Sequence, residues 1–360
     1  MTKIMISPSK FVLGAGELEN LGKYISELGS RAVIVAHKDD YARVKDTLDR
    51  ALINTEYMHA SFCGESSMSE VNRIVKLIEE QKSDTVIGLG GGKALDTAKA
   101  AATLTRNPVI IIPTIASTDA PCSALAIIYK ENGEFEKYMK LPRNPDLVLA
   151  DSAVIAKAPA RFLIAGMGDA LATVFEARAC IKSFANNMSG GQSTKAALAI
   201  AETCYSTLLE DALKAKAACD ANVVTPALEN IIEANILLSG LGFESSGLAA
   251  AHAIHDGLTA LSETHKYYHG EKVSFGTIVQ LVMENADRNT LHSVLDFCKS
   301  LSLPTCLKDL GVENLDDDRL NLVAELSCAE GETIHNMPFP VTPALVAAAI
   351  RTADRIGSGM

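Results

Sequence analysis

Long apolar runs are missing from this 360-residue sequence. No uncharged hydrophobic stretch reaches about 18 residues, so no membrane-spanning helix is expected. Residues 1–8 lack the apolar segment of a signal peptide. Lysine and arginine form no cluster, and the net charge is −11. Because phosphate backbones are bound by clustered cations, we expect no nucleic-acid partner and no membrane partner.

Closely spaced cysteine pairs are also missing. The eight cysteines are scattered, and none forms a Cys-x-x-Cys motif, which argues against a zinc ribbon and a thioredoxin-like redox pair. Without a signal peptide, scattered cysteines predict free thiols and a cytoplasmic protein. Hydrophobic residues make up 48% of the chain, as in ordinary globular proteins, and its length favours two domains.

The chain changes character near residues 151–160. Before that point, strand patterns at 31–36, 56–62, 85–88, 109–113 and 147–150 alternate with helical patterns at 40–53 and 68–81, and a hairpin is expected within 123–138. This alternation predicts a parallel sheet with helices on both faces. From about residue 152, long segments such as 194–218 and 227–241 have helical spacing only. We therefore predict an α/β domain over 1–155 and an all-α domain over 156–360.

A glycine-rich turn follows the third predicted strand, at Gly88-Leu-Gly-Gly-Gly-Lys93. Glycines let a backbone approach a phosphate closely, and the N-terminus of the next helix favours an anion. The turn does not match the Walker A motif, because Ile87 stands where its first glycine belongs and Ala94 replaces its Ser or Thr. It also departs from Gly-x-Gly-x-x-Gly, because Lys93 stands where the last glycine belongs. The alternative is an ordinary tight turn between a strand and a helix.

A polar loop, residues 113–123, follows the next predicted strand. Its hydroxyl groups and the carboxylate of Asp119 suit a ribose, a nicotinamide amide or a polyol, because ligands of open α/β sheets bind beyond the carboxyl ends of strands. An ordinary turn with capping side chains is the alternative.

Four of the eight histidines lie between His252 and His269. His252 and His255 share one face of a predicted helix, next to an apolar run, whereas His265 lies in a polar stretch and is expected to face solvent. Asp169, His252 and His269 would give one carboxylate and two imidazoles, the open ligand set of a catalytic zinc or iron ion. The alternatives are satisfied core histidines and a helix N-cap at Asp169.

Several segments in order give the chain a resemblance to the metal-dependent, iron-containing type of alcohol dehydrogenase. They are Gly90–Lys99, Thr114–Leu125, Gly168–Cys180, Gly247–Gly257, His269–Val273 and Glu330–Met337. The resemblance implies an N-terminal Rossmann-like domain and an all-α C-terminal domain, as in dehydroquinate synthase-like proteins. It also implies reversible, NAD-linked oxidation of glycerol to dihydroxyacetone in a homo-oligomer, commonly an octamer.

The resemblance also implies roles for individual residues. Zinc, or else iron, is expected on Asp169, His252 and His269, which thereby also hold the substrate. NAD is expected to contact Gly90, Gly91, Gly92, Lys93, Asp96, Thr114, Ser117, Thr118, Ser123, Leu125 and Tyr129. Asp119 is expected to orient the polyol. Separately from the resemblance, we expect His255 to help pass the proton of the polyol to solvent. The hypothesis is that the alcohol oxygen binds the metal's open position and loses its proton, and that the carbon bearing this oxygen then transfers a hydride to NAD.

One position departs from the family pattern. An acidic residue usually follows the first strand of the nucleotide domain and faces the adenosine ribose, but His37 stands there, with Asp39 nearby. An acid at that place repels a 2′-phosphate, so His37 leaves NADP open beside NAD. Other vicinal diols such as propane-1,2-diol are alternative substrates. A dehydroquinate synthase-like lyase is disfavoured because few cations beyond Lys272 lie near the motifs, and a nucleotide binder without turnover has no need of a metal site.

Overall fold

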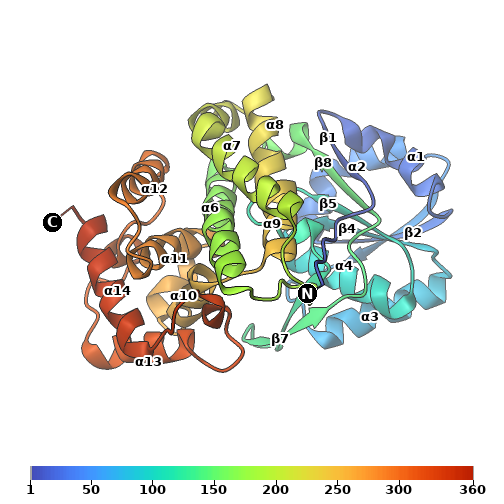
Figure 1. Cartoon of the computed structure of the whole chain (residues 1–360). Coiled ribbons are helices and arrows are strands. Elements are labelled where there is room, and N and C mark those ends of the chain that lie inside the picture. The colour runs from blue at the N-terminus through green and yellow to red at the C-terminus, as the bar shows by residue number, and fades with distance from the viewer. Residues whose placement is uncertain (1, 360) are drawn as a thin grey trace. The chain divides into compact units, whose positions relative to one another are not determined.

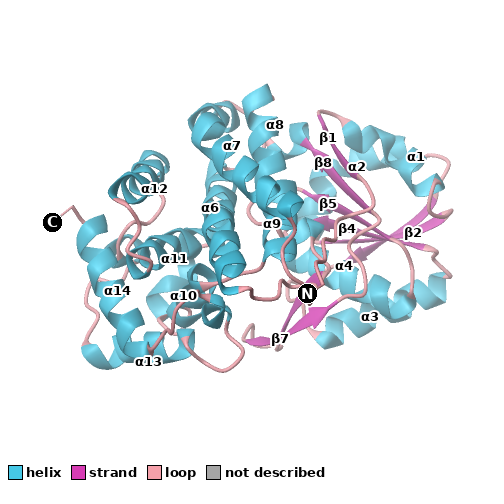
Figure 2. Ribbon diagram, viewed as in Figure 1, coloured by secondary structure: helices cyan, strands magenta, loops and turns pink. Residues whose placement is uncertain are grey.

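The computed structural model describes residues 2–359, which form two compact units. One unit contains residues 6–160 and 217–240 and is built on a parallel sheet. The other contains residues 2–5, 161–216 and 241–359 and is helical. Figure 1 labels the helices and strands, and Figure 2 colours them by type.

The sheet has six parallel strands in the order β1-β8-β5-β4-β2-β3. A separate antiparallel hairpin, β6–β7, follows the loop after β5. The strands are β1 (Phe11–Gly14), β2 (Arg31–Ala36), β3 (Glu56–Ser61), β4 (Thr85–Gly90), β5 (Val109–Pro113), β6 (Leu125–Tyr129), β7 (Phe135–Lys140) and β8 (Leu147–Asp151). The predicted parallel sheet and hairpin are confirmed, but β1 was missed. With β1 counted, the glycine turn follows the fourth strand rather than the third.

Helices cover both faces of the sheet (Figure 1). Helices α1 (Leu21–Ser26) and α2 (Lys38–Ala51) pack on one face, where a core of aliphatic side chains joins them to β2, β4, β5 and β8. Helices α3 (Met68–Gln81) and α4 (Gly92–Thr105) cover the other face. Gly88 permits this packing, since a β-carbon there would lie 2.8 Å from the β-carbon of Ala98 on α4. The close contact fixes the start of α4 at the carboxyl edge of the sheet.

Residues 152–359 contain no named strand, which confirms the predicted helical region. None of the helices within 2–359 is long and apolar enough to cross a membrane. All eight cysteines are free thiols. The helices are α5 (Ser152–Ile155), α6 (Ala160–Ser183), α7 (Lys195–Asp220), α8 (Pro226–Glu233), the π-helix η3 (Ala234–Leu238), α9 (Ser239–Ser246), α10 (Ala250–Leu258), α11 (His269–Met283), α12 (Arg288–Leu301), α13 (Asp317–Ser327) and α14 (Pro343–Gly357).

The two compact units do not correspond to a single division of the chain at residue 155. Residues 217–240 belong to the sheet unit, because α8 packs against β1 and α5. The Sγ atom of Cys219 lies 3.4 Å from the carbonyl oxygen of Ala158, which ties the end of α7 to the same unit. Helical periodicity alone does not reveal which core a helix covers, so the sequence could not assign this segment.

Candidate functional site

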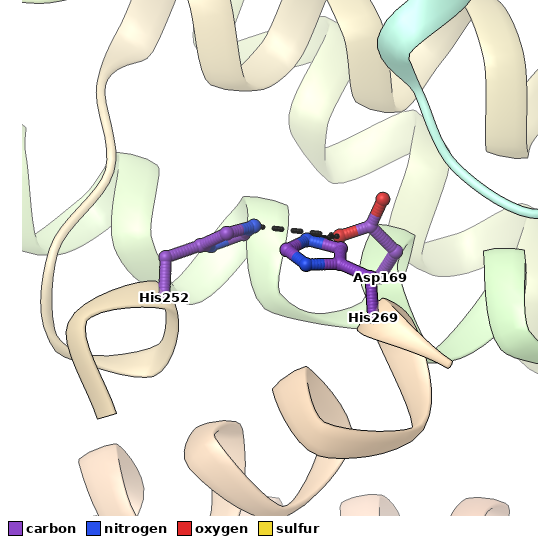
Figure 3. Close-up of side chains that lie close together, drawn as sticks. All are labelled: Asp169, His252 and His269. Atoms are coloured by element: carbon purple, nitrogen blue, oxygen red, sulfur yellow. Dashed lines mark ion pairs between the residues drawn. The ribbon is translucent and has the colours of Figure 1, made fainter. Parts of the chain in front are cut away.

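Asp169, His252 and His269 converge in the helical unit (Figure 3). The Nε2 atoms of His252 and His269 lie 3.4 and 3.1 Å from the same oxygen, Oδ1 of Asp169. Asp169 lies well inside α6, His252 lies on α10 and His269 is the first residue of α11. The N-cap alternative for Asp169 is therefore wrong, and the three predicted ligands do come together.

Two glycines explain why Asp169 and His269 meet. A β-carbon on Gly168 would lie 2.4 Å from the carbonyl oxygen of Gly270, and one on Gly270 would lie 1.8 Å from that of Ala165. The backbones of α6 and α11 are therefore in direct contact at this point. Because Asp169 follows Gly168 and His269 precedes Gly270, the contact places the carboxylate beside the imidazole.

Replacing Gly270 with alanine is expected to destabilise the protein by about 3 kcal/mol or more, because the new methyl group meets backbone rather than a side chain that can rotate away. Urea unfolding of the purified variant measures this loss. Gly92→Ala is the matched control, since a β-carbon there has no heavy atom within 4 Å. Equal urea midpoints for the two variants would contradict the close packing of α6 on α11.

Glu176 holds His252 from the side opposite Asp169. Its Oε2 lies 2.6 Å from Nδ1 of His252, and its Oε1 accepts the backbone N–H groups of Ala249 and His252 at 2.8 and 3.1 Å. The side chain is completely buried. Burial opposes a positive charge on His252, but Glu176 and Asp169 outweigh burial and raise the pKa of His252 well above its ordinary value. The carboxylate thus fixes the ring and directs Nε2 at Asp169.

His255 connects His269 to a second carboxylate. Its Nε2 lies 3.0 Å from Nδ1 of His269, and its Nδ1 lies 2.9 Å from Oδ1 of Asp256. Burial and the neighbouring His269 lower the pKa of His255 to about 3. A neutral His255 can accept a proton from one neighbour while it donates to the other. His265, by contrast, is exposed and bonds the carbonyl oxygen of Thr259, as expected of a residue outside the site.

The donor set of Asp169, His252 and His269 fits a divalent metal ion. One ligand atom from each residue lies within 4.8 Å of the others. Burial would raise the pKa of Asp169, but His269 and His252 lower it well below its usual range, so the carboxylate is charged. One carboxylate and two imidazoles suit zinc and iron, and three protein ligands leave a position for an exogenous one.

The glycine turn lies in the sheet unit, between β4 and α4. Gly90 has a φ of 137°, which L-residues other than glycine rarely adopt. A β-carbon on Gly92 would meet nothing within 4 Å, and one on Gly91 would meet only Ile115 at 3.4 Å. The turn therefore leaves space next to the first N–H groups of α4, as a phosphate requires. Lys93 pairs with Glu65 at 2.7 Å beside this space.

The side chains of the polar loop differ in their hydrogen-bond partners and in their burial. Asp119 accepts a hydrogen bond from the hydroxyl of Ser239 at 2.7 Å, and Thr114 donates to Asp40 at 3.3 Å. Ser117 and Thr118 are half-buried, as is Tyr129, whose ring lies 4.7 Å from Nζ of Lys93. The loop thus offers hydroxyl groups and one carboxylate for a ligand, as its sequence suggests.

Asp96, Ser123 and Leu125 have a different environment from the one expected. Asp96 is fully enclosed and pairs with the ammonium group of buried Lys99 at 2.9 Å. The Ser123 hydroxyl lies 3.3 Å from the same ammonium, which also bonds the carbonyl oxygen of Leu125. These buried polar groups contact one another inside the unit, so a cofactor has little access to the Asp96 carboxylate.

Comparisons with known proteins agree with this arrangement. The family model described as iron-containing alcohol dehydrogenase matches residues 8–152. A glycerol dehydrogenase of Citrobacter freundii is 50% identical over 363 residues, which cover 99% of this chain and 98% of the relative. The chain belongs to the iron-containing alcohol dehydrogenase family. A glycolaldehyde reductase of Halobacterium salinarum is 45% identical and covers 99% of the chain and 98% of its own length. The crystal structure of a Schizosaccharomyces pombe glycerol dehydrogenase has a TM-score of 0.96 at 38% identity, covering 99% of this chain and 91% of that one.

Glu176 and Asp256, which hold His252 and His255, were not predicted from the sequence. Glu176 lies seven residues after Asp169 on α6, a spacing of two helical turns that places both carboxylates on one face. That spacing was the available signal. Asp256 directly follows His255, and only the fold shows that its carboxylate reaches the neighbouring ring.

Proposed function

We propose that the protein catalyses the reversible, NAD-linked oxidation of glycerol to dihydroxyacetone. The observation that supports this most strongly is the convergence of Asp169, His252 and His269 in a chain 50% identical, end to end, to a glycerol dehydrogenase. The lyase alternative loses support, because the relatives are dehydrogenases and a reductase. The enzyme is further proposed to be cytoplasmic and to assemble as a homo-oligomer, by resemblance an octamer.

In this proposal Asp169, His252 and His269 hold a zinc ion, with iron as the alternative. When bound, such an ion lowers the pKa of a hydroxyl group on the substrate. Glu176 keeps the proton of His252 on Nδ1, which leaves Nε2 as the ligand atom. Nδ1 of His269 donates to His255, and His255 donates to Asp256. His255 is thereby placed to help pass a substrate proton outward.

The sheet unit is proposed to bind NAD and the polyol. Gly91 and Gly92 leave room for the pyrophosphate at the N-terminus of α4. The nicotinamide half is proposed to lie along the loop, and Asp119 to accept hydrogen bonds from the polyol while Ser239 holds its carboxylate. The remaining contacts are proposed for Gly90, Lys93, Thr114, Ser117, Thr118, Ser123, Leu125 and Tyr129.

His37 leaves the cofactor preference relaxed. It caps α2, where its ring accepts the backbone N–H of Asp39 at 3.4 Å, and its side chain is 41% exposed. Asp40 does not replace the missing acid at the ribose, since it pairs with Arg43 and accepts from Thr114. At the end of β2 a 2′-phosphate would thus meet the imidazole of His37 in the place of the usual acid, with the exposed carboxylate of Asp39 two residues further on, and NADP is proposed as a second cosubstrate.

Purified protein with glycerol and NAD is expected to produce NADH, measured by its absorbance. The same assay with NADP is expected to show slower turnover, and propane-1,2-diol is tested in parallel. Reduction of glycolaldehyde with NADH tests the second candidate, which the 45% identical reductase favours. Absence of turnover with every one of these compounds, in protein shown to contain metal, would overturn the proposed function.

A further inference from the structure

Lys99 is a buried charged side chain that the proposed reaction does not use. It is 1% exposed and ranks among the largest fully buried side chains of the protein. Its ammonium group lies 2.9 Å from Oδ1 of Asp96, 2.8 Å from the carbonyl oxygen of Ala120 and 3.3 Å from Oγ of Ser123, and it also bonds the carbonyl of Leu125. A buried ammonium group is tolerated only when its donors are satisfied in this way.

Apart from Asp96, the partners of Lys99 belong to one short segment. Residues 120–125 run from the short helix η2 (Ala120–Cys122) into the start of β6, directly after Asp119. Asp96 holds the next residues of the same segment, because its Oδ2 accepts the backbone N–H of Ile127 on β6 at 3.0 Å. Asp96 and Lys99 lie three residues apart on α4, one turn after the glycine turn.

We propose that Lys99, paired with Asp96, is a positioning residue that sets the distance between the glycine turn and the polar loop. Helix α4 is the rigid part that joins them: its N-terminus borders the space for the pyrophosphate, and its next turn grips the loop through three main-chain carbonyl groups. This inference rests on the proposed function, in which the loop carries the nicotinamide half and the polyol.

Two other anchors of the loop are neutral asparagine side chains. Asn235 donates to the carbonyl oxygen of Ala116 at 2.9 Å, and Asn144 donates to that of Cys122 at 2.9 Å. Lys99 differs because its charge draws several carbonyl groups to one point, and because it shares a helix with the glycine turn. Its loss is therefore expected to move residues 120–125 while the turn stays in place.

The double variant Asp96→Asn/Lys99→Met tests the proposal without leaving a lone buried charge. Its affinity for ADP, which reaches only the adenosine and pyrophosphate part, is expected to stay within about twofold of wild type. Its affinity for NADH is expected to fall clearly, and kcat/KM for glycerol to fall about a hundredfold, as a misplaced substrate predicts. Lower thermal stability with unchanged kcat/KM and an unchanged ratio of NADH to ADP affinity would reduce Lys99 to a structural role and overturn the proposal.

Lys99→Arg covers the case in which the double variant does not fold. Arginine keeps the positive charge but is too large for the space between the oxygen atoms that surround the Lys99 ammonium group. This variant is therefore expected to raise KM for glycerol while ADP binding persists. Unchanged KM in this variant would also overturn the proposal. Wild-type protein that turns over no glycerol would refute the proposed function alone, because the ratio of NADH to ADP affinity tests Lys99 independently.

Discussion

Asp169→Asn is expected to lower kcat/KM for glycerol by about a thousandfold or more. Asp169 supplies the single carboxylate of the ligand set, and both imidazole Nε2 atoms face its Oδ1. A metal ion contributes several kcal/mol to stabilising charge in a transition state, and each 1.4 kcal/mol corresponds to a factor of ten in rate. The loss is measured as NADH production together with the metal content of the purified variant.

Asp296→Asn is the matched control for this experiment. Asp296 is exposed on α12 of the same unit, so the same change of charge there is expected to leave metal content and turnover unchanged. Dialysis of wild-type protein against a chelator should reproduce the loss, and addition of Zn²⁺ or Fe²⁺ should show which ion restores activity. Full activity in protein verified to be free of metal would rule out a catalytic ion.

The ligands could be predicted because their residue types are chemically specific. The histidine tract beside an apolar run suggested a metal, Asp169 was a candidate third ligand beside its alternative as an N-cap, and the family resemblance implied zinc on Asp169, His252 and His269. Their convergence depends on Gly168 and Gly270, whose backbones touch although they lie on different helices. No local pattern in the sequence shows that two glycines face each other, so the geometry behind the prediction became visible only in the fold.

The sequence was least informative where a residue acts through another. Asp96 follows the glycine turn and was expected to contact the cofactor, but its carboxylate is turned inward to Lys99. The side on which a helical residue lies depends on which strand the helix covers, here β4 through Gly88. Strand β1 was missed for a related reason: its four residues are only half-buried at an edge of the sheet and carry no clear alternation.

Glu176→Gln is expected to weaken zinc binding by about tenfold to a hundredfold, the usual effect of losing a carboxylate behind a histidine ligand. The glutamine side chain has nearly the same shape as glutamate, but it cannot form all of the hydrogen bonds that the carboxylate makes to its neighbours. If its amide oxygen accepts from the N–H groups of Ala249 and His252, its NH₂ group faces Nδ1 of His252. The ring must then carry its proton on Nε2, where the metal would bind. If the amide is turned over, its NH₂ group opposes two backbone donors instead.

The expected signature of Glu176→Gln is therefore a shift in zinc dependence rather than a loss of catalysis. Activity is expected to be low at limiting zinc and to approach the wild-type value when zinc is added in excess, because the three ligands remain. Glu202→Gln is the control, since Glu202 is half-exposed and its pair with Arg178 at 3.4 Å lies on the surface, where such pairs contribute little. Wild-type zinc affinity in Glu176→Gln would show that the carboxylate does not set the tautomer of His252, whereas activity that zinc cannot restore would give Glu176 a part in the reaction itself.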